Sequence, residues 1–273
     1  VAAAKCLQDD GFEVSVFEKT DRIGGTYVFR DDFKGGPYKS LTMQSSKYTF
    51  LYSDQPATED MDIFPTVDQI NNYLHNYVAK HNLGERIYLN HEVVEVSKDN
   101  QTWKIVANNS GVKNTRYFEA VILCTGSYWK PKVPKIEGLE NFNGTVLTAN
   151  NYHANSIFKN QRVLVVGGGV SGSDIASEAA DTAQAVYFST RKRTWILPSF
   201  LGFVPSELTA SYVGRVVNAG IEAEEFRQNL VRAIPQYMEM YQKSGLLPEG
   251  IHNNAIGTSE DLIPKVASGS IKV

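Results

Sequence analysis

The sequence has few cysteines and a net charge close to zero. Two cysteines occur in 273 residues, Cys6 and Cys124, which excludes a disulfide-stabilised scaffold and indicates a reducing compartment. Lys plus Arg total 27 against 30 Asp plus Glu, so the net charge is −3. That charge has the wrong sign to hold nucleic acid or an anionic membrane. No apolar run reaches the roughly 18 residues that a membrane span needs, and we expect no secretory signal peptide. We expect a cytoplasmic enzyme without a nucleic-acid partner.

Motifs for metal and hydrolytic chemistry are also absent. The sequence contains no HExxH, CxxC or G-x-S-x-G pattern, so it predicts neither a zinc site nor a hydrolase nucleophile. The five histidines are scattered without ligand spacing, and we expect structural or surface roles for them: His75, His81, His91, His153 and His252.

The composition is that of a globular protein. Hydrophobic residues make up 42% and charged residues 21% of the chain, which is ordinary usage. At about 150 residues per domain, the length predicts two domains. The chain opens on helix formers without a capping residue, and residues 270–273 form a strand pattern that nothing follows. We therefore expect it to be a piece of a longer protein.

The first half alternates helix and strand patterns. Residues 1–9 predict a helix, and a strand over 12–17 ends at Glu18. Residues 67–80 carry apolar side chains at helical spacing. The near-continuous apolar run 120–125 predicts a strand buried on both faces, with Cys124 packed inside. Shorter strands are expected at 87–89, 93–97, 103–106 and around Tyr117.

The second half begins after a proline-containing linker at 128–134. A strand over 162–166 leads into the glycine loop 167–172, a helix over 173–181 and a further strand over 185–189. A long helical pattern over 222–243 should be kinked or divided at Pro235. This order of elements predicts a doubly wound α/β fold.

The glycine loop is the strongest local signal. Gly167, Gly169 and Gly172 match G-x-G-x-x-G directly after a strand and at the start of a helix. Glycine permits the tight turn and the close approach of a pyrophosphate, which then lies at the positive end of the helix. The alternative is a purely structural turn.

The end of the next strand distinguishes the two nicotinamide cofactors. A site for NAD usually places an acid about 20 residues after the glycines. Here the strand ends in Ser189, Thr190 and Arg191, with no acid. Hydroxyls and a guanidinium suit the 2′-phosphate of NADP(H). The alternatives are a solvated basic loop and a localisation tract.

Glu18 has the opposite character at the end of the first predicted strand. An acid in that position would hold the hydroxyls of an adenosine ribose, and Arg22, Gly24 and Gly25 follow it closely. A solvated surface carboxylate is the alternative.

Taken together, these motifs resemble the flavin-containing monooxygenases. The matching stretches are Phe17-Glu18-Lys19, residues 23–27, residues 45–47, residues 52–54, residues 124–126, Pro131 with Pro134, Phe142-x-Gly144 with Tyr152, residues 167–172 and residues 189–191. The combination is more specific than any one of them.

The resemblance implies two doubly wound Rossmann-like domains, with the NADP domain inserted in the FAD domain. We expect the FAD domain at 1–139, the NADP domain at 140–263 and the return to the FAD domain at 264–273. The implied reaction uses FAD, NADPH and O2 to oxygenate a small amine or sulfide through a C4a-hydroperoxyflavin. The protein could be a homodimer, in the cytoplasm or on the cytoplasmic face of the endoplasmic reticulum.

The resemblance also implies site residues. Gln44 is the expected catalytic residue, at a place where the family usually has Asn; Thr148 stands where it usually has His. The residues expected to contact FAD or NADP(H) are Glu18, Arg22, Gly24, Gly25, Thr26, Tyr27, Gln44, Ser45, Thr125, Gly126, Gly167, Gly169, Ser171, Gly172, Ser173, Asp174, Ser189, Thr190 and Arg191.

Two other functions stay open. One is a related Baeyer–Villiger or amine N-hydroxylating monooxygenase. The other is a catalytically impaired dinucleotide-binding protein, which the substitutions at Gln44 and Thr148 motivate.

Overall fold

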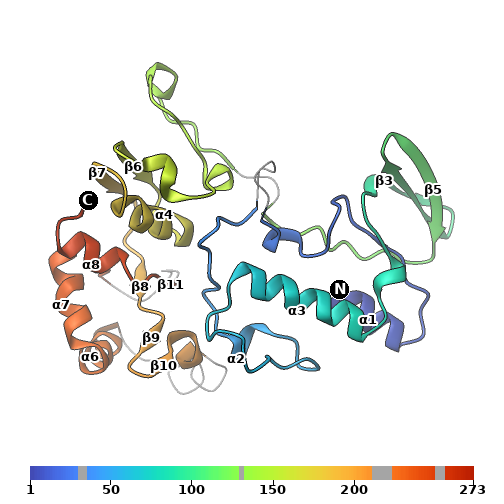
Figure 1. The fold of residues 1–273 in the computed structure, drawn as a ribbon, viewed down its shortest axis with the longest axis horizontal. Helices are drawn as coiled ribbons and strands as arrows, with labels where there is room; N and C mark the ends of the chain where they lie inside the picture. The colour runs from blue at the N-terminus through green and yellow to red at the C-terminus, as the bar shows by residue number, and fades with distance from the viewer. Residues whose placement is uncertain (30–35, 129–131, 211–222, 250–255) are drawn as a thin grey trace. The chain divides into compact units, whose positions relative to one another are not determined.

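The computed structural model describes residues 1–29, 36–128, 132–210, 223–249 and 256–273. The chain forms two compact units. Unit 1 comprises Val1–Met43 and Leu51–Asn151, and unit 2 comprises Gln44–Phe50 and Tyr152–Val273 (Figure 1). Both units combine helices and strands, which agrees with the predicted α/β class. The assignment of one unit to FAD and the other to NADP(H) stays a prediction.

Two helices form the core of unit 1. Helix α1 (Ala2–Asp9) contributes Ala4, and α3 (Val67–Lys80) contributes Tyr77 and Val78 to one buried cluster. Thr66 begins α3 because its hydroxyl accepts the Gln69 N–H while the Gln69 side chain accepts the Thr66 N–H, a complete capping box. The bounds of α3 match those predicted from the apolar stripe.

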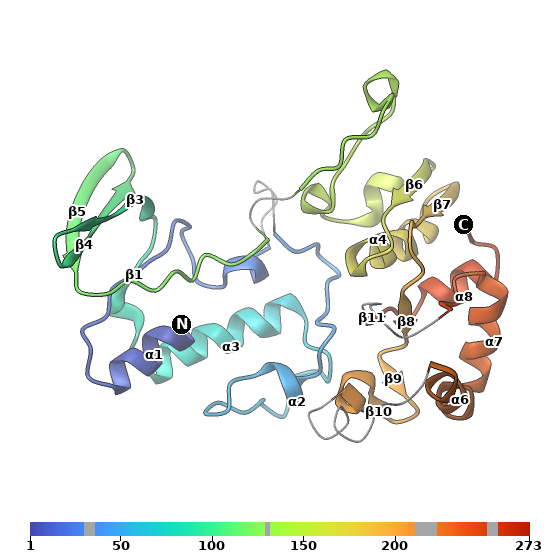
Figure 2. The same cartoon turned by 180° about the vertical axis from the view of Figure 1, so that it is seen from behind.

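The strands of unit 1 form two small sheets. β1 (Val16–Phe17) and β2 (Ile87–Tyr88) pair in parallel. β3 (Glu92–Asp99), β4 (Thr102–Asn109) and β5 (Val112–Phe118) form an antiparallel meander (Figure 2). The predicted strands in this region are confirmed.

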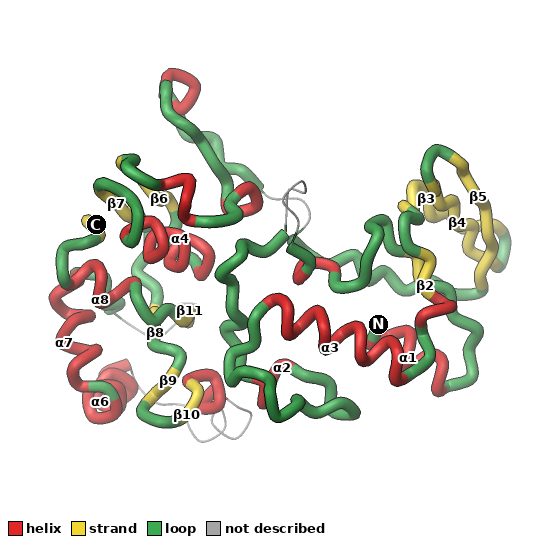
Figure 3. The backbone as a smooth tube through the Cα atoms, viewed as in Figure 1, coloured by secondary structure: helices red, strands yellow, loops and turns green. Residues whose placement is uncertain are grey.

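Two strand predictions in unit 1 are wrong in whole or in part. Of residues 12–17, only Val16 and Phe17 pair, with β2. Residues 120–125 form no strand, and Ile122, Leu123 and Cys124 are exposed. Figure 3 draws this stretch as loop. A strand needs a neighbour for its backbone N–H and C=O groups, and none of the described residues pairs with this run.

Unit 2 is built on a parallel sheet in the order β12-β7-β6. β6 (Arg162–Val166) pairs with β7 (Ala185–Ser189), and β12 (Ile271–Lys272) pairs with β7 on the other side. The strands over 162–166 and 185–189 are confirmed, and the strand at the end of the chain has a partner. One face of β6 is open, since Leu164 is 63% and Val166 59% exposed.

The helices of unit 2 complete its framework. α4 (Val170–Ala180) crosses from β6 to β7, and α8 (Leu262–Ala267) precedes β12. The long pattern at 222–243 is divided as predicted into α6 (Ala223–Ala233) and α7 (Pro235–Ser244), with Pro235 at the first helical position. Residue 222 lies outside the described residues.

Two further pairs of short strands belong to unit 2. β8 (Trp195–Leu197) runs parallel to β11 (Ile256–Thr258), and β9 (Phe200–Leu201) pairs with β10 (Val204–Pro205). Trp195 is buried against the ring of Tyr241 at 5.8 Å between centroids. α2 (Lys47–Phe50) also belongs to this unit. Short 3₁₀ helices occur in unit 1 at Gly25–Tyr27, Gly84–Arg86, Leu139–Asn141 and Ala149–Asn151, and in unit 2 at Asn155–Phe158 and Ser206–Ala210.

Across the described ranges, every helix is too short or too polar to cross a membrane.

Candidate functional site

The predicted glycine loop connects β6 to α4 in unit 2. Gly167 follows directly on Val166, has φ +119°, and donates its N–H to the Ser189 carbonyl oxygen at 2.8 Å. Such a φ is open to glycine but costly for other residues. Gly167, Gly169 and Ser171 are all exposed. The loop is therefore a fixed turn whose outer side is accessible.

Close packing requires two of the glycines. A Cβ on Gly172 would lie 2.0 Å from the Gly167 carbonyl oxygen, and a Cβ on Gly168 would lie 2.3 Å from the Thr190 hydroxyl oxygen. A Cβ on Gly169 would meet nothing within 4 Å. Gly172 thus permits the helix to start close to the strand, whereas Gly169 faces open space.

The start of α4 suits an anion. Gly169 is the N-cap, no side chain caps the helix, and its first turn contains no acid. The uncapped N–H groups and the helix dipole together favour a phosphate. The residues present therefore fit the pyrophosphate of a dinucleotide.

The three residues predicted to distinguish NADPH from NADH, Ser189, Thr190 and Arg191, lie beside this loop. Val166 and Ser189 are register partners on β6 and β7, so Ser189 stands next to the residue that enters the glycine loop. The Thr190 hydroxyl donates to the Lys192 carbonyl at 2.7 Å, which folds the following turn. Arg191 is exposed. The Arg191 guanidinium therefore lies just past the end of β7, where it could contact the adenosine ribose of a bound dinucleotide.

The three polar residues of α4 that were predicted to contact a cofactor differ in their surroundings. Ser171 is exposed, and Asp174 is half-buried. Ser173 is buried, and its hydroxyl donates to the Gly169 carbonyl at 3.1 Å. That bond ties the Ser173 hydroxyl to the helix itself.

Thr194 also contacts the glycine loop. Its hydroxyl donates to the Gly168 carbonyl at 3.2 Å and so ties the turn after β7 to that loop. No motif marks this threonine.

Glu18 directly follows β1 in unit 1, and its N–H donates to the Tyr88 carbonyl at 3.0 Å. Its Oε1 accepts from both the N–H and the hydroxyl of Thr20, each at 2.8 Å. Thr20 therefore fixes the orientation of the carboxylate. Arg22 is exposed and pairs with Asp21 at 3.2 Å.

The residues after Arg22 form a tight turn. Gly24 has φ +134° and Gly25 φ +56°, and Gly25–Tyr27 form a single 3₁₀ turn. A Cβ on Gly24 would lie 2.2 Å from the Asn71 side-chain oxygen. Thr26 and Tyr27 are half-buried, and burial raises the pKa of the Tyr27 hydroxyl. This turn packs on α3, from which Asn71 projects.

Thr125 and Gly126 lie in the exposed loop that was predicted as a buried strand. Gly126 has φ +73°, a conformation that glycine adopts readily. The structure gives these two residues no partner strand among the described residues.

Gln44 and Ser45 belong to unit 2, although residues 1–43 belong to unit 1. The Gln44 Nε2 donates to the Thr258 carbonyl at the end of β11, at 3.0 Å. Ser46 follows, and its N–H donates to the Glu207 Oε1 at 2.6 Å. Sequence analysis missed Thr258 and Glu207, because they are separated from Gln44 and Ser46 by 214 and 161 residues and no motif marks them.

A charged cluster surrounds Asp54 in unit 1. Lys5 Nζ lies 3.3 Å from its Oδ2, the Tyr77 hydroxyl donates to it at 3.1 Å, and His81 Nε2 lies at 3.5 Å. Burial alone raises the pKa of the Asp54 carboxyl, but the bonds from Lys5 and Tyr77 outweigh it and lower that pKa. Burial and the bond to Asp54 raise the pKa of Tyr77 to about 12.

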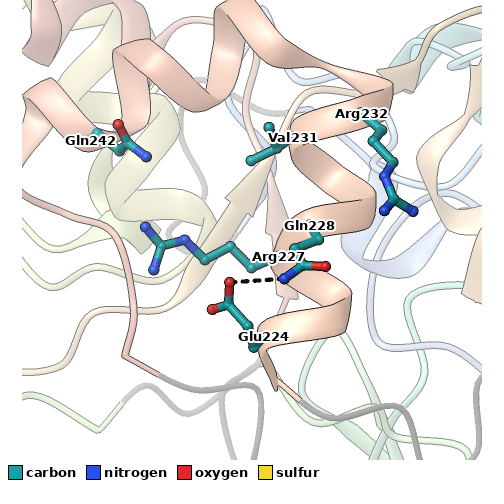
Figure 4. A pocket seen from close by; sticks show the side chains of 6 residues that line it. All are labelled: Glu224, Arg227, Gln228, Val231, Arg232 and Gln242. Atoms are coloured by element: carbon teal, nitrogen blue, oxygen red, sulfur yellow. Dashed lines mark hydrogen bonds between the residues drawn. The ribbon is translucent and has the colours of Figure 1, made fainter.

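A surface hollow on α6 and α7 lies apart in sequence from every predicted site residue. Figure 4 shows Arg227 and Glu224 facing it, with the Gln228 Nε2 donating to the Glu224 Oε1 at 3.3 Å. The remaining lining residues are Val231, Arg232 and Gln242. Separately, the described part of the chain contains no group of three or more His, Cys, Asp or Glu side chains that could hold a metal.

Comparison with known proteins identifies the class. The model of the flavin-binding monooxygenase-like family matches residues 1–217. This chain therefore belongs to the flavin-binding monooxygenase-like family, as the sequence resemblance indicates.

Individual relatives agree with this placement. The chain is 34% identical over 207 residues to flavin-containing monooxygenase 1 of Mus musculus, covering 72% of this chain and 39% of that protein. It is 32% identical over 204 residues to the 4-hydroxybenzoate brominase (decarboxylating) of Marinomonas mediterranea, covering 74% and 39%. The chain thus spans about two fifths of the length of these curated relatives.

The solved structure of OTEMO in complex with FAD and NADP has a similar fold. It matches with a TM-score of 0.58 at 21% identity, covering 88% of this chain and 42% of that one. At this identity the likeness shows the fold, and it confirms the predicted pair of Rossmann-like domains. FAD and NADP(H), the cofactors predicted from the sequence, are those of the family.

Proposed function

We propose that the protein is an NADPH- and O2-dependent monooxygenase that oxygenates the nitrogen of an amine or the sulfur of a sulfide. In this reaction one oxygen atom enters the substrate, the other leaves as water, and NADPH supplies two electrons. A bound FAD would supply the oxygen chemistry, by the C4a-hydroperoxyflavin route that the family resemblance implies. The protein's own residues would bind and orient the two dinucleotides.

One observation carries the NADPH part of this proposal. The uncapped start of α4 adjoins the end of β7, where Ser189 is the register partner of Val166. A pyrophosphate at α4 would direct the adenosine ribose toward Thr190 and Arg191. No carboxylate stands at the end of β7 to repel a 2′-phosphate. This geometry supports a preference for NADPH over NADH.

The carboxylate of Glu18 and the amide of Gln44 would contact the flavin cofactor. Glu18, with one oxygen held by Thr20, would accept hydrogen bonds from the ribose hydroxyls of FAD. Gln44 would present its amide to the reacting cofactors, which is the role expected of it as a catalytic residue. The full protein would act in the cytoplasm or on the cytoplasmic face of the endoplasmic reticulum, and a homodimer is compatible with the family.

The similarity to a brominase favours a second candidate function, the halogenation of an aromatic substrate. Identity to that enzyme, 32%, is nearly equal to the 34% shared with a flavin-containing monooxygenase. The two candidates would share their cofactors and would differ in whether a halide or an organic nucleophile is oxidised. Substrate assays, rather than cofactor assays, separate them.

The deciding experiment uses the protein loaded with FAD. We expect a visible flavin spectrum that NADPH bleaches without oxygen, and N- or S-oxide formation from N,N-dimethylaniline or methyl p-tolyl sulfide once oxygen is admitted. Product from 4-hydroxybenzoate and bromide instead would favour the halogenating candidate. A protein that binds no flavin under any condition would overturn both.

A further inference from the structure

The segment Gln44–Phe50 belongs to unit 2, whereas the residues on both sides of it in the sequence belong to unit 1. The chain before it, Val1–Met43, and the chain after it, from Leu51, belong to unit 1, but the segment itself belongs to unit 2. This is the segment that contains Gln44. Its side-chain amide can be oriented only if something in unit 2 holds the segment.

Two hydrogen bonds do so. The Gln44 Nε2 donates to the Thr258 carbonyl at 3.0 Å, and the Ser46 N–H donates to the Glu207 Oε1 at 2.6 Å. The Thr49 hydroxyl lies 3.5 Å from the same Oε1, a weaker contact. A hydrogen bond to a charged carboxylate is about twice as strong as a neutral one, so Glu207 is the stronger of the two anchors.

Both anchors are supported by the same strand, β8. Thr258 ends β11 and is the register partner of Leu197 at the end of β8. Just past β8, the Pro198 carbonyl accepts a hydrogen bond from the hydroxyl of Ser206, the residue before Glu207. The Ser206 N–H also donates to the Ser199 carbonyl at 2.8 Å. Glu207 and Thr258 are therefore set relative to one another by the sheet.

The burial of this contact is costly, which argues for a role. Ser46 is fully buried, and its hydroxyl oxygen and the Glu207 Oε2 are both buried without a hydrogen-bond partner. An alanine at 207 would remove a partly unsatisfied carboxylate from the interior, and a buried unsatisfied oxygen is unfavourable. Stability alone does not explain a glutamate here.

We propose that Glu207 is a positioning residue: by accepting the Ser46 N–H, it holds the segment that carries Gln44 and so fixes the direction of the Gln44 amide. This rests on the proposed function only for its consequence, which is the coupling of NADPH oxidation to product formation. The anchoring itself does not depend on which reaction the protein catalyses.

Hydrogen–deuterium exchange tests the anchoring in the FAD-loaded protein. Glu207→Ala should speed amide exchange in a peptide covering residues 44–50 by about ten- to hundredfold. Glu207→Gln retains an oxygen at the same reach but without the charge, so it should speed exchange less than Glu207→Ala does. If Glu207→Ala does not fold, Glu207→Asp replaces it, because it keeps the charge but withdraws the oxygen by one methylene. Unchanged exchange in the folded variant would overturn the anchoring.

Glu260 offers a matched control. Its Oε1 accepts the Ser199 N–H at 2.6 Å, a bond of the same type and length that does not involve residues 44–50. Glu260→Ala should speed exchange around Ser199 and accelerate the 44–50 peptide much less than Glu207→Ala does, because it acts only on the turn after β8 that supports Ser206. Equal acceleration of the 44–50 peptide in both variants would show general loosening of the unit and contradict a specific anchor.

Peroxide release tests the consequence. Glu207→Ala should raise the fraction of oxidised NADPH that ends as hydrogen peroxide, and Glu207→Gln should restore coupling. Combined with Gln44→Ala, it should add little to the single change, since both act through the same amide. Faster exchange with unchanged coupling would overturn the positioning role. Absence of flavin binding in the wild type would overturn the proposed function instead, with exchange still deciding the anchor.

Discussion

Gly172 lies so close to Gly167 that a Cβ on Gly172 would stand 2.0 Å from the Gly167 carbonyl oxygen. Backbone, not a movable side chain, occupies that space. The glycine loop therefore has its shape before any nucleotide binds, and the third glycine of the motif is required by the fold as well as by the ligand.

Replacing Gly172 by alanine should unfold unit 2 more easily. Relief of the contact needs a shift between β6 and α4, and overpacking of this kind typically costs about 1–3 kcal/mol. Gly169→Ala is the control, because a Cβ there meets nothing within 4 Å and φ is −83°. Urea unfolding of the ligand-free protein measures both. Equal stability of the two variants would contradict the structural role of Gly172.

Arg191→Ala should raise the apparent KM for NADPH strongly and leave that for NADH nearly unchanged. The lost charge-assisted contact to a 2′-phosphate is worth about 1.5–3 kcal/mol, or roughly 10- to 150-fold in affinity. Lys192 and Arg193, both exposed beside it, would replace part of the contact, so we expect a value toward the lower end.

Arg162 provides the comparison for this experiment. It lies at the first position of β6, at the opposite end of the strand from the glycine loop. Arg162→Ala should affect neither coenzyme. Equal weakening of NADPH and NADH by Arg191→Ala would remove Arg191 from coenzyme selection, as would equal use of both coenzymes by the wild type.

The predictable parts of the fold are those with a local signal. The apolar stripe of α3 lies on contiguous residues, and Thr66 with Gln69 caps the helix within one turn. The glycine loop likewise needs only a strand before it and a helix after it. In such cases the interactions that determine the structure join residues close in sequence, so the local sequence pattern is enough to predict the element.

The predictions fail where the structure depends on a partner that is distant in the sequence. The apolar run 120–125 would be buried only beside a neighbouring strand, and none of the described residues supplies one, so Leu123 is 73% exposed. β8 and β11 are three residues each, too short for a periodicity. Nothing in the sequence near Gln44 indicates that its amide meets the Thr258 carbonyl 214 residues later.

Shortening Gln44 tests its proposed part in coupling. Gln44→Asn keeps the amide but withdraws it by about one methylene, to the residue usual in the family. The side chain gives up its bond to Thr258, while the bond from the Ser46 N–H to Glu207 still holds the segment. We expect less hydrogen peroxide per NADPH oxidised, measured by stopped-flow and peroxide assays. Gln242→Asn, in the surface hollow on α6 and α7, serves as control. Unchanged coupling in Gln44→Asn would remove this side chain from the mechanism.

Alkaline pH should destabilise unit 1 through Tyr77. Burial and the hydrogen bond to Asp54 raise the pKa of Tyr77 to about 12, whereas in an unfolded chain it titrates near pH 10. Below pH 10 the hydroxyl is protonated in both states, so its contribution to stability is complete. As the pH rises from about 10 to 12, the unfolded chain releases the proton and the folded chain retains it, so the free energy of unfolding falls.

Tyr77→Phe should flatten that part of the pH profile, because phenylalanine fills the same core position without an ionisable hydroxyl. Urea unfolding at several pH values between about 9 and 12 gives the slope. Tyr48→Phe is the matched control, since Tyr48 is 63% exposed and should keep the wild-type slope. Buried tyrosines of unit 2 whose pKa burial also raises, among them Tyr237 and Tyr241, leave a remaining dependence in both variants. A profile for Tyr77→Phe that coincides with that of the wild type would show that the Tyr77 hydroxyl loses its proton equally readily in the folded and unfolded states.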